Sequence, residues 1–245
     1  MIAQDEIRKL GTKYQTSELN IMREYLQHLF LSYFYQLPLS TDIYFKGGTA
    51  LRFVYQSARF SEDLDFSTNK EDIPGIENIL LEVLGKVEKE NIQATLQEAK
   101  TTSGGYLAII DFMLLGQTIP IQVEISFREK EDTGEVVTVA SDFIPPYTLV
   151  ILAQDQLVSG KIRALKARKK ARDFYDIYFI LRKQLLTPDK RGVLPEVLHA
   201  LRSLNINFEV DLKQFLPRSH WVIIRDFKNT LEREIDRLDP LILNS

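Results

Sequence analysis

The sequence of 245 residues contains no cysteine, which excludes disulfides, thiolate zinc sites and cysteine nucleophiles. Histidine is almost as rare: only His28, His199 and His220 occur, and no two have metal-ligand spacing. Each is expected on a helix face or in the core. No apolar run approaches the roughly 20 residues of a membrane helix, and the N-terminus lacks the basic-then-apolar order of a signal peptide. We therefore expect a cytoplasmic protein without a membrane partner.

A strong net charge is also missing, since 31 Lys and Arg against 34 Asp and Glu give −3. A protein that coats nucleic acid normally has a basic domain, so this balance argues against one. The exception is the segment 161–172 (KIRALKARKKAR), where seven of twelve residues are cationic and none is acidic. This segment predicts either a local patch for a polyanion or a solvated helix face.

The arrangement of apolar residues predicts an α+β protein: a mixed sheet with flanking helices, followed by a C-terminal helical bundle domain. The boundaries are 1–146 for the N-terminal helices and α/β domain, and 147–245 for the helical domain. Strands are expected at 43–45, 64–67, 92–98, 106–115, 119–127 and, at an edge, 136–139. Helices are expected at 4–36, 50–56, 74–90, 148–170, 171–186, 191–203 and 219–238.

Two carboxylates, Asp63 and Asp65, lie two residues apart in a predicted strand. Their side chains therefore point to one face, with Cβ atoms roughly 6–7 Å apart. A cation between them would relieve their repulsion, and Mg²⁺ (or Mn²⁺) prefers such oxygen ligands and can also bind phosphates. Taken alone, a D-x-D pattern more often marks a solvated acidic turn.

A glycine-rich turn, Lys46-Gly47-Gly48-Thr49, precedes this pair where a strand meets a helix. Glycines let a backbone approach a ligand closely, and free N–H groups at such a turn suit phosphate. Lys46 adds a positive charge and Thr49 a hydroxyl donor. Taken alone, the turn is equally explained by the steric needs of the chain reversal.

A third carboxylate is needed for a two-metal phosphoryl-transfer site, and two residues compete for that role. Glu124 lies in Ile121-Gln-Val-Glu-Ile125, on the strand face opposite to the apolar residues. Asp111 lies in a similar setting on the preceding strand. We favour Glu124, although an ordinary outward-facing strand residue would show the same pattern.

Two blocks of the sequence resemble a known family. The run FKGGTALR (45–52), followed by RFSEDLDF (59–66), resembles the first motif of the AbiEii/AbiGii toxin family, which belongs to the DNA polymerase β-like nucleotidyltransferase superfamily. KIRAL (161–165) and RKKARDFYD (168–176) resemble its second block, K-h-x-A-L then R-x-x-x-R-D-h-x-D, where h is apolar. The resemblance extends from about residue 40 to 185, and it implies that the mixed sheet with flanking helices is of the nucleotidyltransferase type.

This resemblance implies metal-dependent transfer of a nucleoside monophosphate from an NTP to an acceptor. The implied acceptor is RNA, for example a tRNA 3′ end, and the implied role is that of a toxin with a cognate antitoxin acting in trans. The candidate catalytic residues are Asp63, Asp65, Lys161 and Asp173. Two roles stay open for Asp173: it would orient Arg172 or Lys161, or it would serve as a base near the acceptor hydroxyl. The implied metal ligands are Asp63, Asp65 and Glu124, and the implied phosphate-binding residues are Lys46, Gly47, Gly48, Thr49, Arg168 and Arg172.

Helical spacing places Lys161, Arg168 and Arg172 within about 20° of one stripe if their helix is continuous. Such a stripe could contact a triphosphate. In the alternative, Asp173 and Asp176 form surface ion pairs with Arg172 or Lys169.

Two other functions stay open. One is a non-catalytic NTP-binding or partner-binding module of the same fold. The other is a transferase whose acceptor is a protein hydroxyl or a small molecule such as an aminoglycoside.

Overall fold

The computed structural model describes residues 1–129 and 131–238, which fold into two compact units. The first unit is Met1–Ala153 and the second begins at Gln154. The first contains a mixed sheet with helices and the second is helical, so the α+β fold class predicted from the sequence is confirmed. No helix among the described residues is long and apolar enough to span a bilayer.

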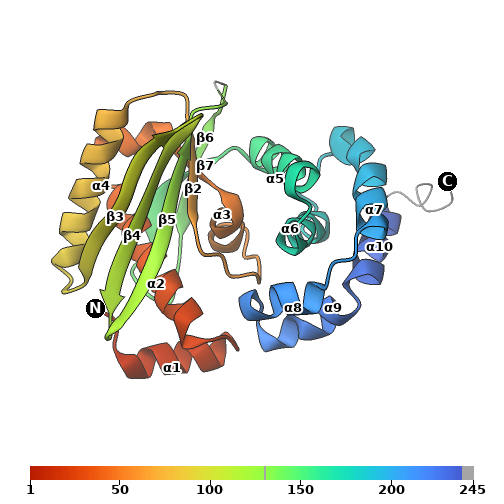
Figure 1. The fold of residues 1–245 in the computed structure, drawn as a ribbon, viewed down its shortest axis with the longest axis horizontal. Helices are drawn as coiled ribbons and strands as arrows, with labels where there is room; N and C mark the ends of the chain where they lie inside the picture. The colour runs from red at the N-terminus through yellow and green to blue at the C-terminus, as the bar shows by residue number, and fades with distance from the viewer. Residues whose placement is uncertain (130, 239–245) are drawn as a thin grey trace. The chain divides into compact units, whose positions relative to one another are not determined.

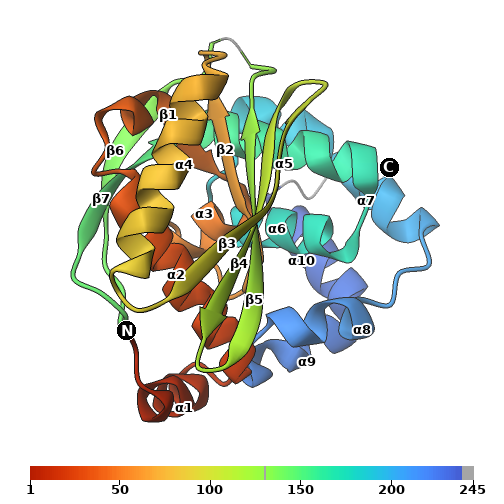
Figure 2. The ribbon, with the colours of Figure 1, turned by 60° about the vertical axis from the view of Figure 1, so that its left-hand side comes forward.

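The first unit is built on a seven-stranded sheet in the order β3-β4-β5-β2-β1-β7-β6. β1 pairs parallel with β7 and β2 parallel with β5, whereas the other neighbours are antiparallel. Figure 2 shows β6 and β7 beside β1, at the opposite side of the sheet from β3. The strands are β1 Ile43–Lys46, β2 Leu64–Thr68, β3 Gln93–Thr102, β4 Gly105–Leu114, β5 Gln117–Ser126, β6 Gly134–Val139 and β7 Tyr147–Leu152.

The helices of the first unit are α1 Gln4–Lys13, α2 Glu18–Phe34, α3 Gly47–Phe53 and α4 Ile73–Glu88, with a short 3₁₀ turn η1 at Pro38–Asp42. Side-chain caps begin two of them: Ser17 accepts the Asn20 N–H at 3.3 Å, and Asp72 accepts the Gly75 N–H at 3.0 Å. Helices α2 and α4 lie side by side against the sheet (Figure 1).

The two faces of the sheet differ in polarity, as the alternation of the strand sequences predicts. On β2, β4 and β5 the residues facing α2 and α4 are buried and apolar, and Phe34 of α2 stacks on Phe66 at a centroid distance of 5.0 Å. The alternate residues, including Asp65 and Glu124, are half-buried or exposed over most of these strands. The buried face fixes the register, so it also fixes which polar residues are neighbours on the other face.

The second unit is a set of helices around an aromatic core. Phe208 contacts both Phe174 and Phe227, with ring centroids 5.8 and 4.6 Å away. Its helices are α5 Gln154–Arg168, α6 Ala171–Arg182, α7 Leu194–Ser203, α8 Phe208–Leu212, α9 Trp221–Arg225 and α10 Phe227–Leu238, with 3₁₀ turns η2 Pro188–Val193, η3 Lys213–Phe215 and η4 Arg218–His220.

The prediction of a helix from residue 148 was wrong, because Tyr147–Leu152 forms strand β7. Its residues Leu149 and Ile151 are buried between β1 and β6. A six-residue apolar run does not distinguish a buried strand from a helix by its periodicity. The two compact units therefore divide after β7 rather than before it, where the domain boundary was expected.

The condition for one cationic stripe in the second unit, a continuous helix, is not met. Helix α5 ends at Arg168, Lys169 adopts a left-handed conformation with φ 52°, and Lys170 is extended. The helix is not continuous, so the spacing of Lys161, Arg168 and Arg172 does not place all three on one face.

Candidate active site

A row of charged side chains crosses three neighbouring strands of the first unit. Lys46, the last residue of β1, lies opposite Asp65 on β2, and Asp65 lies opposite Glu124 on β5. Opposed residues of adjacent strands have side chains on the same face, with Cβ atoms about 4.5–5.5 Å apart. One ammonium group and two carboxylates are therefore neighbours on the polar face of the sheet.

The register also distinguishes the two candidates for the third carboxylate. Asp111 lies opposite Pro120, whereas Leu107 lies opposite Glu124. Asp111 is thus four residues along the strand from the row that contains Asp65, which corresponds to about 13 Å. Both carboxylates are on the same face, but the register favours Glu124.

The loop before β2 is held by side chains that bind its carbonyl groups. Asp63, the residue before β2, has its carbonyl oxygen bound by the Thr49 hydroxyl at 2.5 Å. Gln27 of α2 donates to the carbonyls of Ser61 and Glu62, both at 3.1 Å. The hydroxyl of Thr49 was expected to donate a hydrogen bond to phosphate. It instead donates its hydrogen bond to the Asp63 carbonyl of this loop.

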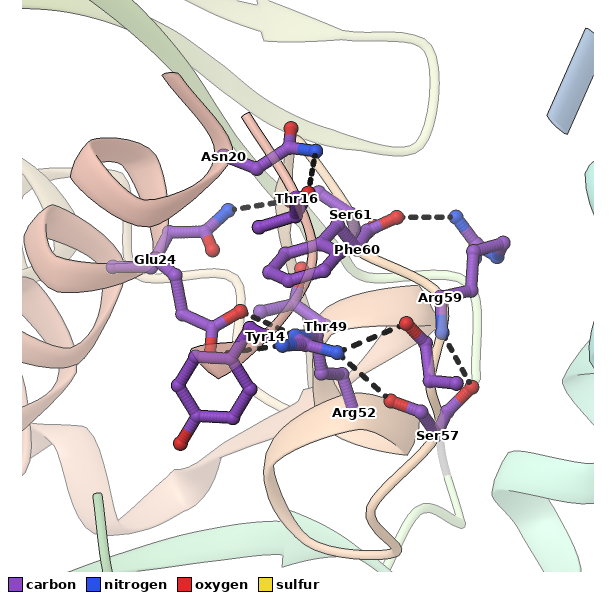
Figure 3. A network of polar contacts seen from close by, with 12 residues as sticks. Tyr14, Thr16, Asn20, Glu24, Thr49, Arg52, Ser57, Arg59, Phe60 and Ser61 are labelled. Atoms are coloured by element: carbon purple, nitrogen blue, oxygen red, sulfur yellow. Dashed lines mark hydrogen bonds and ion pairs between the residues drawn. The ribbon is translucent and has the colours of Figure 1, made fainter. Parts of the chain in front are cut away.

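Arg52 of the first motif continues this support (Figure 3). It donates to the carbonyls of Ser57 and Ala58 at 3.1 Å, and its guanidinium lies 3.5 Å from the centroid of the Phe60 ring. It also forms a buried ion pair with Glu24 of α2. Burial raises the pKa of Glu24, and the positive charge of Arg52 opposes that rise. Removing Arg52 would leave a buried carboxylate without its cation, which typically costs about 3–5 kcal/mol.

The two glycines of the first motif are needed because neighbouring side chains approach them closely. Gly47 has φ 85°, and a Cβ added to it would lie 2.0 Å from Oδ2 of Asp65. A Cβ on Gly48 would lie 2.4 Å from a terminal guanidinium nitrogen of Arg59 and 2.7 Å from Oγ of Ser61. Gly47 thus allows the glycine turn to lie directly against the carboxylate of Asp65.

Four carboxylates influence the charge of Lys46. Burial lowers its pKa below the ordinary value, while the charges of Asp65, Asp132, Glu124 and Glu129 act in the opposite direction. Lys46 thus brings a positive charge to a row that is otherwise acidic.

Asp132 and Glu129 were not predicted from the sequence. They lie in the charged segment 128–132, directly after the strand that carries Glu124. Such a segment is typical of a solvated loop. The feature that could have identified these residues is the run of carboxylates close in sequence to Glu124.

A metal ion is expected at this site from the sequence. The donors have the right chemistry, because Asp65 and Glu124 present carboxylate oxygens from adjacent strands. In residues 1–129 and 131–238, however, no three Asp, Glu or His side chains are arranged to hold a metal together. The ligand set Asp63, Asp65 and Glu124 therefore stays a prediction.

The second block contains two ion pairs within the second unit. Nζ of Lys161 lies 2.7 Å from Oδ2 of Asp176, whose side chain is 3% exposed. Arg168 lies 2.6 Å from Oδ1 of Asp173, whose side chain is 1% exposed, and Oδ2 of Asp173 accepts the Lys170 N–H that precedes α6. These carboxylates are buried, so the alternative of surface ion pairs with Arg172 or Lys169 was wrong.

These contacts give Asp173 and Asp176 a role in stabilising the α5–α6 connection. Asp173 joins the end of α5 to the start of α6, and Asp176 holds Lys161. Arg172 is half-buried in the first turn of α6. The predicted contributions of Lys161, Arg168, Arg172 and Asp173 to a reaction are not tested by these contacts.

Comparisons with known proteins agree with this architecture. A crystal structure of an H. pylori protein provisionally assigned as a nucleotidyltransferase superposes with a TM-score of 0.62 at 20% identity, covering 92% of this chain and 98% of the other. The structure of JHP933 from Helicobacter pylori also gives 0.62, at 22% identity and 93% coverage of each chain. At these identities the likeness shows a shared fold.

The family comparison covers most of the chain. Residues 29–239 match the family described as "Nucleotidyl transferase AbiEii toxin, Type IV TA system". A search of curated proteins gives no match. The matched range includes both motif blocks, the strands of the charged row and α5 to α10.

Proposed function

Because the chain belongs to the nucleotidyl transferase AbiEii toxin family of type IV toxin–antitoxin systems, we propose that it moves a nucleoside monophosphate from an NTP to an RNA acceptor. The observation that carries this proposal is the direct opposition of Asp65 and Glu124 on adjacent strands. Lys46 flanks the pair, and the turn at Gly47 lies against Asp65.

Asp63, Asp65 and Glu124 would hold Mg²⁺ or Mn²⁺, which neutralises phosphate charge during phosphoryl transfer. The register of β2 and β5 supports the choice of the last two. The support for Asp63 is that its backbone is fixed by Thr49, immediately before the strand. A side chain held by a fixed backbone loses less entropy when it binds a ligand.

Lys46 and the backbone N–H groups of Gly47, Gly48 and Thr49 would bind the nucleotide phosphates. Helix α3 has only seven residues, so we attribute this binding to the turn and to the charge of Lys46 rather than to a helix dipole. The Thr49 hydroxyl is assigned to the loop that carries Asp63.

In the second unit we propose that Arg168 and Arg172 supply positive charge for the leaving pyrophosphate, and that Lys161 and Asp173 act in catalysis. A variant of Lys161 or Asp173 also loses an internal ion pair. The free energy of unfolding of such a variant must therefore be measured together with its activity, so that a loss of catalysis is distinguished from a loss of folded protein.

The choice of RNA as acceptor, with a tRNA 3′ end as the first candidate, rests on the charge of the α5–α6 connection. Lys166, Lys169 and Lys170 are exposed there beside Arg168. Clustered cations bind a phosphate backbone by releasing its counterions. The cognate antitoxin would act in trans.

The test is incubation of the protein with each α-labelled NTP and total cellular RNA in Mg²⁺. We expect labelled RNA with one NTP and a loss of at least about 100-fold in Asp65→Asn, because electrostatic stabilisation of the reacting phosphate is the main catalytic term. Asp111→Asn, which removes a carboxylate from the same face about 13 Å away, is the matched control and should retain activity. Equal labelling by wild type and Asp65→Asn would overturn the proposal.

One observation favours a second candidate, a non-catalytic NTP-binding or partner-binding module. Among the described residues, no three-donor metal arrangement is present. This candidate predicts that the protein binds NTP together with the Mg²⁺ of the nucleotide but labels no RNA, protein or small-molecule acceptor.

A further inference from the structure

The two edge strands of the sheet in the first unit differ in how they are protected against pairing with another chain. β3 forms one edge and β6 the other. β3 carries the charges of Glu98 and Lys100 and an irregularity of register between Leu96 and Glu98, which are features that blunt an exposed edge. β6, with the sequence GEVVTV, has a single charge and pairs with β7 in an unbroken register. Of the two edges, β6 is therefore the one suited to a further strand.

The free hydrogen-bonding groups of β6 are identified by its pairing with β7. Just before β6, the Thr133 carbonyl accepts the Ala153 N–H at 2.9 Å, and these two residues are opposite each other in the continuation of the β6–β7 register. In an antiparallel ladder, such hydrogen-bonded pairs alternate with pairs whose N–H and C=O groups point away from the partner strand. The backbone groups of Gly134, Val136 and Thr138 therefore point to the outer edge. Within residues 1–129 and 131–238, no strand pairs with that edge.

An exposed apolar side chain lies in the middle of the same edge. Val136 is 75% exposed, the largest value among the large apolar residues in the described part of the chain. Thr138, on the same face of β6, is also exposed. An unpaired edge of β-branched residues is a template for pairing with another chain.

We propose that β6 pairs antiparallel with β6 of a second copy of this chain, about a two-fold axis at Val136. In this register Val136 lies opposite its own copy, and Gly134 lies opposite Thr138, so all the outward-pointing backbone groups of the strand find partners. Glu135 lies opposite Val137, so no like charges are directly opposed. The two copies of Glu135 are diagonal neighbours about 7–8 Å apart, where salt screens their repulsion.

A second copy is favoured over an unrelated strand because the edge is self-complementary. A two-fold axis brings the same surface of both copies together, so the exposed valine of one copy is covered by the exposed valine of the other. The paired strands do not include those of the charged row, which lies on β1, β2 and β5, and β7 separates β1 from β6. Dimer formation and RNA labelling are therefore separate properties.

The first experiment is sedimentation of the intact protein over a range of concentrations. We expect the average mass to rise with concentration toward twice that of one chain, since an interface formed mainly by one short strand is small and makes a weak dimer. Val136→Lys places like charges opposite each other at the axis and should abolish the rise, without loss of RNA labelling. Val210→Lys changes a similarly exposed valine on α8 and is the control, which should associate like wild type.

The second experiment tests the register with single cysteines, because the chain has none of its own. Val136→Cys places two thiols on directly opposed residues, whose Cα atoms are about 5.5 Å apart, within the range of a disulfide. It should cross-link under mild oxidation. Thr138→Cys lies on the same face, but its two copies are offset by about 13 Å along the strands and should stay reduced.

Three results would overturn the inference. One is a protein that stays monomeric at all concentrations, and another is association that persists in Val136→Lys, because a different surface would then form the dimer. The third is cross-linking of Thr138→Cys as fast as that of Val136→Cys. Failure of the wild type to label RNA would refute the proposed function and leave this dimer unaffected.

Discussion

The imidazole ring of His28 is buried in the first unit, stacked on Phe53 at a centroid distance of 3.8 Å. Its Nδ1 lies 2.9 Å from the Tyr147 hydroxyl. This is the core position expected for an isolated histidine. Burial, assisted by the charge of Arg52, lowers the pKa of His28 to about 3. The neutral ring is therefore part of the packing between α2, α3 and β7.

This residue predicts a pH dependence of stability. The unfolded chain binds a proton at His28 below its ordinary pKa of about 6.5, whereas the native protein does not until near pH 3. Its contribution is thus complete above pH 6.5 and is lost as the pH falls toward 3, by up to about 1.4 kcal/mol per pH unit.

Urea unfolding between pH 6.5 and 5 measures this slope. We expect His28→Asn to flatten it, while His199→Asn, at an exposed position, keeps the wild-type slope. Parallel slopes in all three proteins would contradict the prediction.

At the scale of the elements, we expect opposite effects from substituting a glycine in the β1–α3 turn and a glycine inside α4. Gly47→Ala combines φ 85° with a steric clash against Asp65, so we expect a loss of at least about 1–2 kcal/mol together with a loss of RNA labelling. Gly85→Ala is the control, because Gly85 lies inside α4 with nothing within 4 Å of the added Cβ. It should stabilise by about 0.5–1 kcal/mol. Chemical denaturation measures both, and destabilisation by Gly85→Ala or stabilisation by Gly47→Ala would contradict the account.

The connection between α5 and α6 makes a similar prediction. Lys169 adopts φ 52°, which costs a side chain about 1–2 kcal/mol relative to glycine. Lys169→Gly should therefore raise the unfolding free energy of the second unit by up to about 1 kcal/mol. Ala167→Gly, inside α5, should lower it by about 1 kcal/mol. A loss of stability in both variants would show that the left-handed turn is not strained.

These elements also show what local sequence can predict. The strand–turn–helix–strand segment 43–66 is encoded by neighbouring residues, and its prediction was confirmed apart from the boundaries of its helix. Strand β7 was missed because its short apolar run gives no strand signal of its own, and its strand character comes from pairing with β6 and with β1, the latter about a hundred residues away. The left-handed Lys169 was missed because lysine gives no turn signal. Asp132 was missed because its backbone is held by the side chain of Asn69, and no periodicity reports such a contact.

For the whole molecule, the two compact units have separate cores, with Phe66 in the first and Phe174 in the second. Chains with more than one core commonly depart from two-state unfolding. We therefore expect two transitions in scanning calorimetry.

Phe66→Ala and Phe174→Ala identify the transitions, since each removes a fully buried ring at a cost of about 3–5 kcal/mol. We expect Phe66→Ala to lower the melting temperature of one transition and Phe174→Ala that of the other. Mg²⁺ with NTP should raise the transition lowered by Phe66→Ala, because a ligand stabilises the unit that binds it. A single transition lowered by both variants would show that the two units unfold together. In that case a variant of a metal ligand in the first unit and a variant of a cation in the second would both change the same free energy of unfolding. The activity of variants in either unit would then have to be corrected for the fraction of protein that is unfolded.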